Sequence, residues 1–384
     1  MPELTVVDCS VGEGGGGALR AALPMAVLTG RPVRLTNIRA NRSGRSAGVG
    51  WTHRTYIEAL RGWTSSEAEY TMGGTELTFY PGHVPDSEIL IDLDDPVGTF
   101  GANTVSGRRN YLEASDRFME NVDNVDGKGL MGNAVSVFFV GLLPLLYAAP
   151  PSASVEVSGG TETLGAPFVD VVRDSLFPAA NELTGKRLSI SVQRRGCIGR
   201  GGGFATAAHD QGQAGPVSRL RRNRDTSQTV TARFYIFGGR QWRATAAGKV
   251  VDFTARLSSH LSRTVSAEVE MVPYPVNRAQ VLFLVGSGIY SRDISFCSEE
   301  VGREAFDVEG VLDRLSPELD LIGFTSRFIA EQLLPLLCTK PGPSMIKTEK
   351  ITPHLFTVAA LARSITGRKI DLTESTLGAT VVVR

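Results

Sequence analysis

The stretch that decides the fold reads Val11-Gly12-Glu13-Gly14-Gly15-Gly16-Gly17-Ala18-Leu19-Arg20. A β-branched run, Leu4 to Val7, precedes it, and an apolar run typical of a helix, Ala18 to Leu28, follows it. Backbone N–H groups in a turn without side chains can approach a phosphate, and a helix N-terminus favours negative charge. The stretch therefore predicts a strand, a phosphate-binding turn and a helix, with Glu13 as a metal-type ligand and Arg20 as a cation for phosphate.

Two alternatives remain for the glycines themselves. They fit Gly-x-Gly-x-x-Gly, and a dinucleotide fold would then need an acidic residue about 20 positions on, or an arginine for a 2′-phosphate. Arg39 could supply that arginine for NADP. The alternation of strands and helices expected for a parallel sheet does not follow, however, and no Lys-Ser/Thr pair completes a Walker motif. A flexible turn that binds no ligand is the second alternative.

The composition is that of a globular chain of 384 residues with a formal net charge of zero, long enough for two or more domains. The neutral charge does not indicate nucleic acid, although arginines cluster locally. The four cysteines lie far apart without a Cys-x-x-Cys pair, which argues against a zinc site and favours a reducing cytoplasm. We expect no signal peptide, and the run from Val135 to Ala149 is too short to span a membrane.

A short signature occurs three times: a helical pattern, then Leu/Ile-Thr-Gly-Arg/Lys, then a strand pattern. The three copies are Leu28 to Arg31, Leu183 to Lys186 and Ile365 to Arg368. Glycine is the usual left-handed residue after a helix, and cations suit that end of the helix dipole. The signature predicts a repeated α/β unit. We expect a main domain from residues 1–184 and 278–384 and a smaller inserted domain over 185–277, with residues 98–132 as a surface excursion.

His354 is distinctive among the five histidines, which show no metal-ligand spacing. It follows Pro353 at the start of an apolar helical pattern, Leu355 to Leu361. A helix N-terminus favours a neutral, nucleophilic imidazole and receives a phosphate. The alternative is a partly buried histidine that merely caps the helix.

Taken together, the motifs resemble the RNA 3′-terminal phosphate cyclase family, in the family's order and over nearly the whole chain. The resemblance implies a mixed α+β fold of three repeated α/β units, each a four-stranded sheet with packed helices as in enolpyruvyl transferases, plus the smaller inserted domain. The motifs are Gly12 to Gly16 with Arg20, Ile38 to Arg42, Val155 to Thr161, Arg194 to Gly203, Ala330 to Leu333 and His354 to Thr357.

The resemblance also implies a reaction. His354 would attack the α-phosphate of ATP and form a covalent histidine–AMP, and AMP would pass to an RNA 3′-phosphate. The vicinal 2′-hydroxyl would then close a 2′,3′-cyclic phosphate. Glu13 would hold a divalent metal, Mg or Mn. By the same resemblance Gly14, Gly15, Glu331 and Gln332 would contact the nucleotide, and Arg20, Arg39, Arg42 and His53 the substrate phosphate. A cytoplasmic enzyme without a membrane partner is implied, with a homodimer as an open expectation.

The sequence departs from the family pattern at several positions. Thr52 stands where the family usually has glutamine before the histidine, Glu331 where it has aspartate, and Val358 where it has asparagine. The changes fall mostly where the acceptor would bind. Two alternatives therefore remain: a divergent adenylyltransferase or cyclase acting on another phosphate or carboxylate, and a non-catalytic scaffold that binds RNA or protein.

Overall fold

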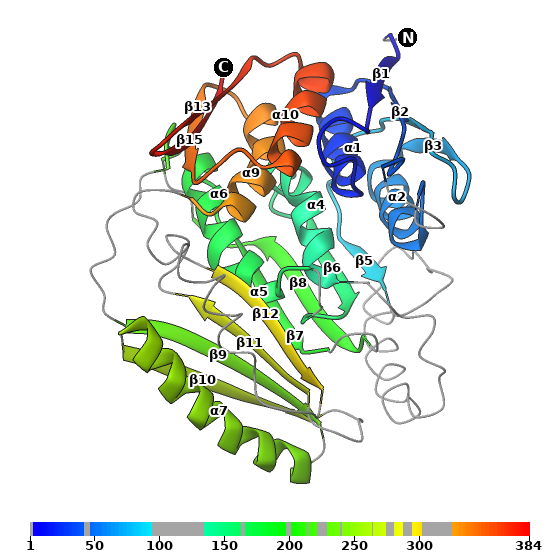
Figure 1. Cartoon of the computed structure of the whole chain (residues 1–384). Coiled ribbons are helices and arrows are strands. Elements are labelled where there is room, and N and C mark those ends of the chain that lie inside the picture. Colours follow the sequence, from blue (N-terminus) through cyan, green and yellow to red (C-terminus); the bar gives the residue numbers. More distant parts are fainter. Residues whose placement is uncertain are drawn as a thin grey trace.

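The computed structural model describes residues 3–41, 47–93, 134–162, 166–196, 201–212, 215–220, 229–238, 240–262, 264–273, 280–286, 294–301 and 325–384. These residues form a mixed α+β fold in which small sheets lie around a group of packed helices (Figure 1). The predicted fold class is confirmed at this level. Arg42, the expected excursion over residues 98–132 and the arginines between 221 and 224 lie outside the described residues.

The first unit contains the glycine turn. Its four strands are ordered β1-β2-β4-β3, with β1 and β2 parallel and the other neighbours antiparallel. The turn follows β1, and α1 begins within it, as the sequence predicts. The elements are β1 (Thr5–Asp8), α1 (Gly17–Thr29), β2 (Val33–Thr36), α2 (Trp51–Thr64), β3 (Glu67–Tyr70) and β4 (Leu77–Tyr80).

The second unit repeats this arrangement. Its strands are ordered β5-β6-β8-β7, again with one parallel pair followed by antiparallel neighbours. The second helical segment of this unit is interrupted by a π-helical turn, η3. The elements are β5 (Ile89–Asp92), α4 (Val135–Ala148), β6 (Ser154–Gly159), α5 (Val169–Val171), η3 (Val172–Leu176), α6 (Phe177–Thr184), β7 (Leu188–Arg194) and β8 (Gly203–His209).

A third unit follows the same order near the C-terminus. Its sheet is ordered β13-β15-β14, and a single parallel bridge from Thr325 to Thr348 stands where the first strand pairs in the other units. The described chain therefore runs three times through one strand and helix order. The elements are α9 (Arg327–Thr339), β13 (Ser344–Thr348), α10 (Pro353–Thr366), β14 (Ile370–Ser375) and β15 (Gly378–Val383).

The repeated Thr-Gly signature marks real helix ends. Gly30, Gly185 and Gly367 are all left-handed, with φ of 63°, 73° and 70°. The three glycines do not end equivalent helices of the repeated unit, however. Gly30 ends the first helix of its unit, whereas the other two glycines end the second, and the second helix of the first unit ends at Ser65 (φ 54°). The signature therefore indicates helix-to-strand turns rather than the register of the repeat.

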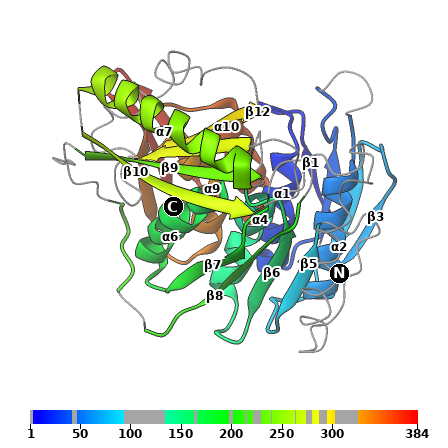
Figure 2. The same cartoon turned by 90° about the horizontal axis from the view of Figure 1, so that it is seen from below.

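A fourth sheet, ordered β10-β9-β11-β12, lies apart from the three units, with α7 covering its outer face (Figure 2). This pairing groups the strands differently from the domain bounds expected from sequence. β7 and β8 complete the second unit, whereas β11 and β12, beyond residue 277, join β9. The division into domains stays a prediction. The elements are β9 (Thr229–Gly238), α7 (Arg240–Leu261), β10 (Thr264–Pro273), β11 (Gln280–Gly286) and β12 (Ile294–Val301).

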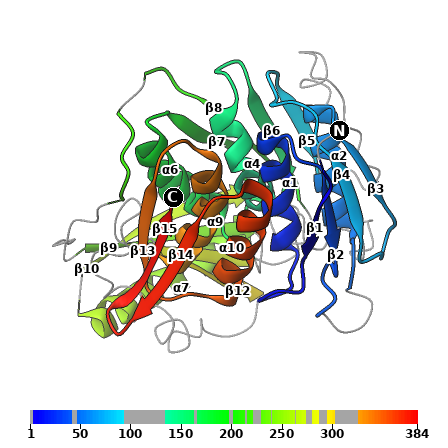
Figure 3. The same ribbon diagram turned by 90° about the horizontal axis from the view of Figure 1, so that it is seen from above.

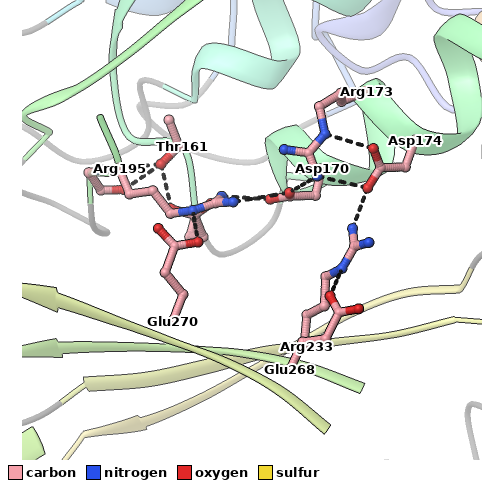
Figure 4. Close-up of polar contacts among 10 residues, drawn as sticks. Thr161, Asp170, Arg173, Asp174, Arg195, Arg233, Glu268 and Glu270 are labelled. Carbon is pink, nitrogen blue, oxygen red and sulfur yellow. Dashed lines mark hydrogen bonds and ion pairs between the residues drawn. The ribbon is translucent and has the colours of Figure 1, made fainter. Parts of the chain in front are cut away.

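An ionic cluster joins the fourth sheet to the second unit (Figure 4). Arg195, just after β7, lies 2.5 Å from a Glu162 oxygen, 2.6 Å from Asp170 and 2.7 Å from Glu270 of β10. Its guanidinium also stacks over the Tyr235 ring of β9, 4.1 Å from the centroid. Glu162 and Asp170 have no exposed side-chain surface. The cluster therefore gives these buried carboxyl groups polar partners and links the fourth sheet to the second unit.

Part of the motif from Arg194 to Gly203 has a structural role in this ionic cluster. A Cβ on Gly196 would lie 2.1 Å from the Gly203 nitrogen, and one on Gly203 would lie 2.6 Å from the Gly159 oxygen. The ends of β6, β7 and β8 thus approach too closely for side chains, and this approach directs Arg195 into the cluster. None of the motif's described residues lines the cavity beside His354 described below.

The centre of the molecule is helical. Helices α1, α4, α9 and α10 pack on one another, and their apolar faces are buried. The apolar run that begins at Val135 forms the buried helix α4. Within the described residues, no helix combines the length and apolar character needed to cross a membrane. Because α1, α9 and α10 meet here, their N-terminal residues can form one site.

Candidate functional site

The glycine turn contacts four polar side chains from other parts of the chain. Figure 3 shows β1, α1 and α10 side by side where this happens. A Cβ on Gly12, Gly14, Gly16 or Gly17 would lie 2.1 to 2.4 Å from a side-chain atom, so only glycine fits there without displacing that neighbour. The turn is therefore a packed surface rather than a loose loop. The contacts are Gly12 with Thr357, Gly14 with Asn41, Gly16 with His53 and Gly17 with His354.

His354 lies in the first turn of α10. The Thr352 side chain caps the helix by accepting the Leu355 N–H at 3.0 Å, and Pro353 follows with its fixed φ, a favoured helix start. The Nδ1 atom of His354 lies 2.7 Å from Oε2 of Glu13. Since a carboxylate can only accept, Nδ1 carries the proton, and the neutral tautomer compatible with this contact has its lone pair on Nε2. The contact fixes the orientation of the imidazole ring.

Glu331 supports the same helix from α9. The Thr352 hydroxyl donates to its Oε1 atom. Burial raises the pKa of Glu331, while this hydrogen bond and the neighbouring His354 oppose the rise. Glu331 and Gln332, which the family resemblance implies lie near a nucleotide, both line the cavity beside His354.

That cavity has a volume of about 270 Å³. Its walls are mainly apolar, while a few polar groups converge on it, as in many small-molecule sites. Such a lining can receive a planar base on its apolar side and charged groups on its polar side. The apolar lining is Ala21, Val140, Gly141, Pro144, Pro167, Phe328, Pro335 and Val358, and the polar lining is Glu13, Arg20, Glu331, Gln332 and His354, with Gly17 between.

Arg20 brings a cation into this cavity from the second turn of α1. Burial lowers the pKa of its guanidinium and nearby Arg39 acts in the same direction, while Tyr56 and Glu13 oppose them. Arginine stays protonated despite such a shift. The Tyr56 hydroxyl donates to the Arg20 carbonyl at 3.2 Å, which fixes the backbone there. Arg20 is thus a partly buried charge suited to a phosphate.

Arg39, in the loop after β2, and His53, in the first turn of α2, lie near the turn and Arg20. Arg39 has a left-handed backbone (φ 54°) and donates to the Gly48 carbonyl at 3.1 Å. The Nδ1 atom of His53 accepts the Gly50 N–H at 3.2 Å, so its Nε2 faces Gly16. A neutral His53 therefore carries its proton on Nε2. The structure brings together Arg20, Arg39 and His53 of the predicted phosphate group, and Arg42 lies outside the described residues.

The site could hold a divalent metal only if a bound substrate supplied part of the coordination shell. Among the described residues, no three His, Cys, Asp or Glu side chains form a metal-type group. Glu13 offers a carboxylate that is 43% exposed at the cavity. Magnesium commonly takes one or two carboxylates and completes its shell with substrate phosphates and water. Glu13 as a metal ligand stays a prediction, to which the structure adds its contact with His354.

Sequence reasoning did not assign the roles of Thr352, Asn41 and Thr357. The Thr-Pro pair before His354 is a usual helix start and could have revealed Thr352. Asn41 donates to the Ser10 carbonyl at 3.0 Å and so holds the start of the turn. That contact and those of Thr357 join residues distant in sequence, which no local pattern encodes.

Comparisons with known proteins show the family of the chain. A family model described as "RNA 3'-terminal phosphate cyclase" matches residues 11–372. A protein of that description from Thermococcus onnurineus is 28% identical over 386 residues, covering 96% of this chain and 95% of its own length. Relatives with the same description from Pyrococcus furiosus and Methanothermobacter thermautotrophicus are 24% and 27% identical, covering 96% and 95% of this chain and 95% of their own length. The resemblance expected from the motifs is confirmed, and the chain belongs to the RNA 3′-terminal phosphate cyclase family.

Proposed function

We propose that the chain is an ATP-dependent RNA 3′-phosphate cyclase that works through a covalent histidine–AMP. The observation that carries the proposal is the contact between His354 Nδ1 and Glu13 Oε2, two residues that line a mixed polar and apolar cavity. It leaves Nε2 as the nucleophilic atom. Family membership supports the reaction class.

In the first step, the Nε2 lone pair of His354 attacks the α-phosphorus of ATP. A P–N bond forms, the bond to the bridging oxygen breaks, and pyrophosphate leaves. Glu13 holds the Nδ1 proton and stabilises the positive charge that the ring gains. Arg20 neutralises charge on the phosphates, and the apolar walls with Gln332 hold the base.

In the second step, an oxygen of the RNA 3′-phosphate attacks the adenylyl phosphorus and displaces His354. In the third, the vicinal 2′-hydroxyl attacks the 3′-phosphorus and AMP leaves, which yields the 2′,3′-cyclic phosphate. Arg39, His53 and Arg42 are the groups we assign to the acceptor phosphate. A phosphate oxygen is a poor leaving group until it is adenylylated, so the covalent step supplies the activation.

The glycine turn provides the remaining contacts. We assign the N–H groups of Gly14 and Gly15 to the nucleotide phosphates, at the N-terminus of α1. Glu13 is the residue that would hold Mg or Mn bound to those phosphates. The metal supplies charge neutralisation at the oxygens around the reacting phosphorus.

The test uses ATP labelled at its α-phosphate, with a divalent cation. We expect a protein adduct that is acid-labile and alkali-stable, as a P–N bond is, and its loss in His354→Ala. His260→Ala is the matched control, because His260 lies near the end of α7. No adduct, or an adduct that survives His354→Ala, would overturn the proposal.

The acceptor is tested separately. An oligonucleotide with a 3′-phosphate should be converted to the cyclic phosphate, and the same oligonucleotide with a 3′-hydroxyl should not. If RNA is held mainly through its phosphates, its affinity should fall steeply with salt. Adduct formation without cyclisation would instead favour an adenylyltransferase that acts on another phosphate or carboxylate. The homodimer and the cytoplasmic location stay predictions.

A further inference from the structure

The hydroxyl of Thr357 joins helix α10 to the glycine turn. Its Oγ1 atom accepts the backbone N–H of Glu13 at 2.9 Å and lies 2.7 Å from the Val11 carbonyl oxygen, to which it can donate. The side chain is buried, with 1% of its surface exposed. One hydroxyl thus brackets Gly12, in the sense that it forms hydrogen bonds with the residues on both sides of that glycine.

Close contact between Gly12 and helix α10 adds to these hydrogen bonds. Gly12 has φ of 73°, and a Cβ there would lie 2.4 Å from Thr357 Oγ1 and 2.7 Å from the Pro353 carbonyl oxygen. Thr357 follows His354 by three residues, so both side chains project from the same side of the helix. The surface of α10 that carries the nucleophile is therefore the surface that touches the turn.

Other helical threonines behave differently. The hydroxyls of Thr184 and Thr366 lie 2.7 and 2.6 Å from the carbonyl four residues earlier and accept an N–H two residues later. Thr357 also approaches such a carbonyl, that of Pro353, at 2.8 Å. What distinguishes it is the pair of bonds to residues more than 340 positions away.

We propose that Thr357 is a positioning residue: it fixes the backbone of Glu13 so that the carboxylate meets Nδ1 of His354, and thereby keeps the lone pair on Nε2. The catalytic consequence rests on the proposed function, whereas the geometric one does not. Without the hydroxyl, the Glu13 N–H and the Val11 carbonyl lose a buried partner, and the turn can move relative to α10. A small displacement of Glu13 then breaks its hydrogen bond with Nδ1 of His354.

The experiment compares Thr357→Val, which keeps the shape and removes the hydroxyl, with Thr357→Ser, which keeps the hydroxyl. Ser364→Ala is the control, because Ser364 is exposed on the same helix and bonds only locally to Ala360. The first readout is the His354 tautomer, followed by ¹⁵N NMR of labelled histidines and assigned with His354→Ala. The second is the single-turnover rate of adduct formation at saturating ATP.

We expect Thr357→Val to fold and to show a mixed His354 tautomer, with an adduct rate lowered about 10- to 100-fold, as when a supporting partner is removed. Thr357→Ser should keep the Nδ1–H form and a rate within about threefold of wild type. A wild-type tautomer and rate in Thr357→Val would overturn the proposal.

Two further results separate the possible failures. If the wild-type protein forms no adduct, the proposed function fails, and the tautomer comparison still decides the role of Thr357. If Thr357→Val does not fold, Gly12→Ala is the second variant, because its added Cβ would push the turn away from Thr357 Oγ1. It should then produce the same mixed tautomer, and an unchanged Nδ1–H form would overturn the proposal.

Discussion

Nδ1 of His354 lies 2.7 Å from Oε2 of Glu13, although 341 positions separate the two residues in the chain. The carboxylate comes from the turn before α1, and the imidazole from the first turn of α10. The contact makes one site from two helix N-termini, both of which favour negative charge. It also assigns the ring proton to Nδ1, which is the basis of the first prediction.

Replacing Glu13 with Gln should slow adduct formation about 100-fold, because the neutral amide no longer stabilises the charge that the imidazole gains. The measurement is the single-turnover rate with α-labelled ATP. Glu76→Gln is the control, since Glu76 forms an exposed pair with Arg34. Recovery of the rate at higher Mn concentration would assign the loss to metal binding; no recovery assigns it to the imidazole.

Replacing Gly17 with Ala should impair the site without unfolding the protein. The added Cβ would lie 2.1 Å from Cε1 of His354, so the imidazole must move. We expect at least about a tenfold lower rate of adduct formation and a melting temperature close to that of wild type. Gly62→Ala is the matched control in helix α2, where a Cβ meets no atom within 4 Å. It should stabilise the fold by about 1 kcal/mol and leave the rate unchanged. An unaltered rate in Gly17→Ala would contradict the observed packing.

Replacing Arg195 with Ala should be strongly destabilising. Asp170 keeps Arg173, at 2.5 Å, whereas the buried Glu162 loses the guanidinium that it contacts. Removing one partner from a buried ionic contact in this way costs about 3–5 kcal/mol. Urea unfolding measures the loss. Arg34→Ala removes an exposed ion pair of similar length, 2.6 Å, and should cost far less, because water and salt screen an exposed pair. Equal losses in the two variants would count against the cluster as the anchor of the fourth sheet.

The same cluster should make stability depend on pH. Burial raises the pKa of Glu162 to about 8, with Asp170 acting in the same direction and Arg195 against it. The folded protein then holds a proton that the unfolded chain releases near pH 4.3. The stabilising contribution is therefore complete below about pH 4.3 and is lost as the pH rises to about 8.

Glu162→Gln mimics the protonated side chain and removes this titration. The stability of the wild type relative to the variant should therefore fall between about pH 4.3 and pH 8 and level off above that range. Parallel stability curves for the two proteins would show that Glu162 does not titrate in this interval. Glu76→Gln, at an exposed carboxylate, serves as the reference variant.

Local spacing in the sequence predicted much of the fold. The glycine turn, the starts of α1 and α10 and the left-handed ends at Gly30, Gly185 and Gly367 agree with the structure. These features depend on contacts within about four residues, which a sequence pattern encodes directly. Strands β3, β8, β13 and β15 were not predicted. β3 alternates Glu with Ala and Tyr at a sheet edge, and β8 is rich in Ala and Gly, so their pairing comes from neighbouring strands rather than from intrinsic preference.

The motifs of the sequence determined which residues belong to the candidate site, namely Glu13, Arg20, Arg39 and His354. Only the tertiary structure decided that Glu13 meets His354, that Thr357 brackets Gly12, and that Arg195 serves the fourth sheet instead of the cavity. The reason is that these contacts follow from the packing of α1 on α10 and from the close approach of β6, β7 and β8. Both are decided by the shapes of whole elements, which residue spacing along the chain does not contain.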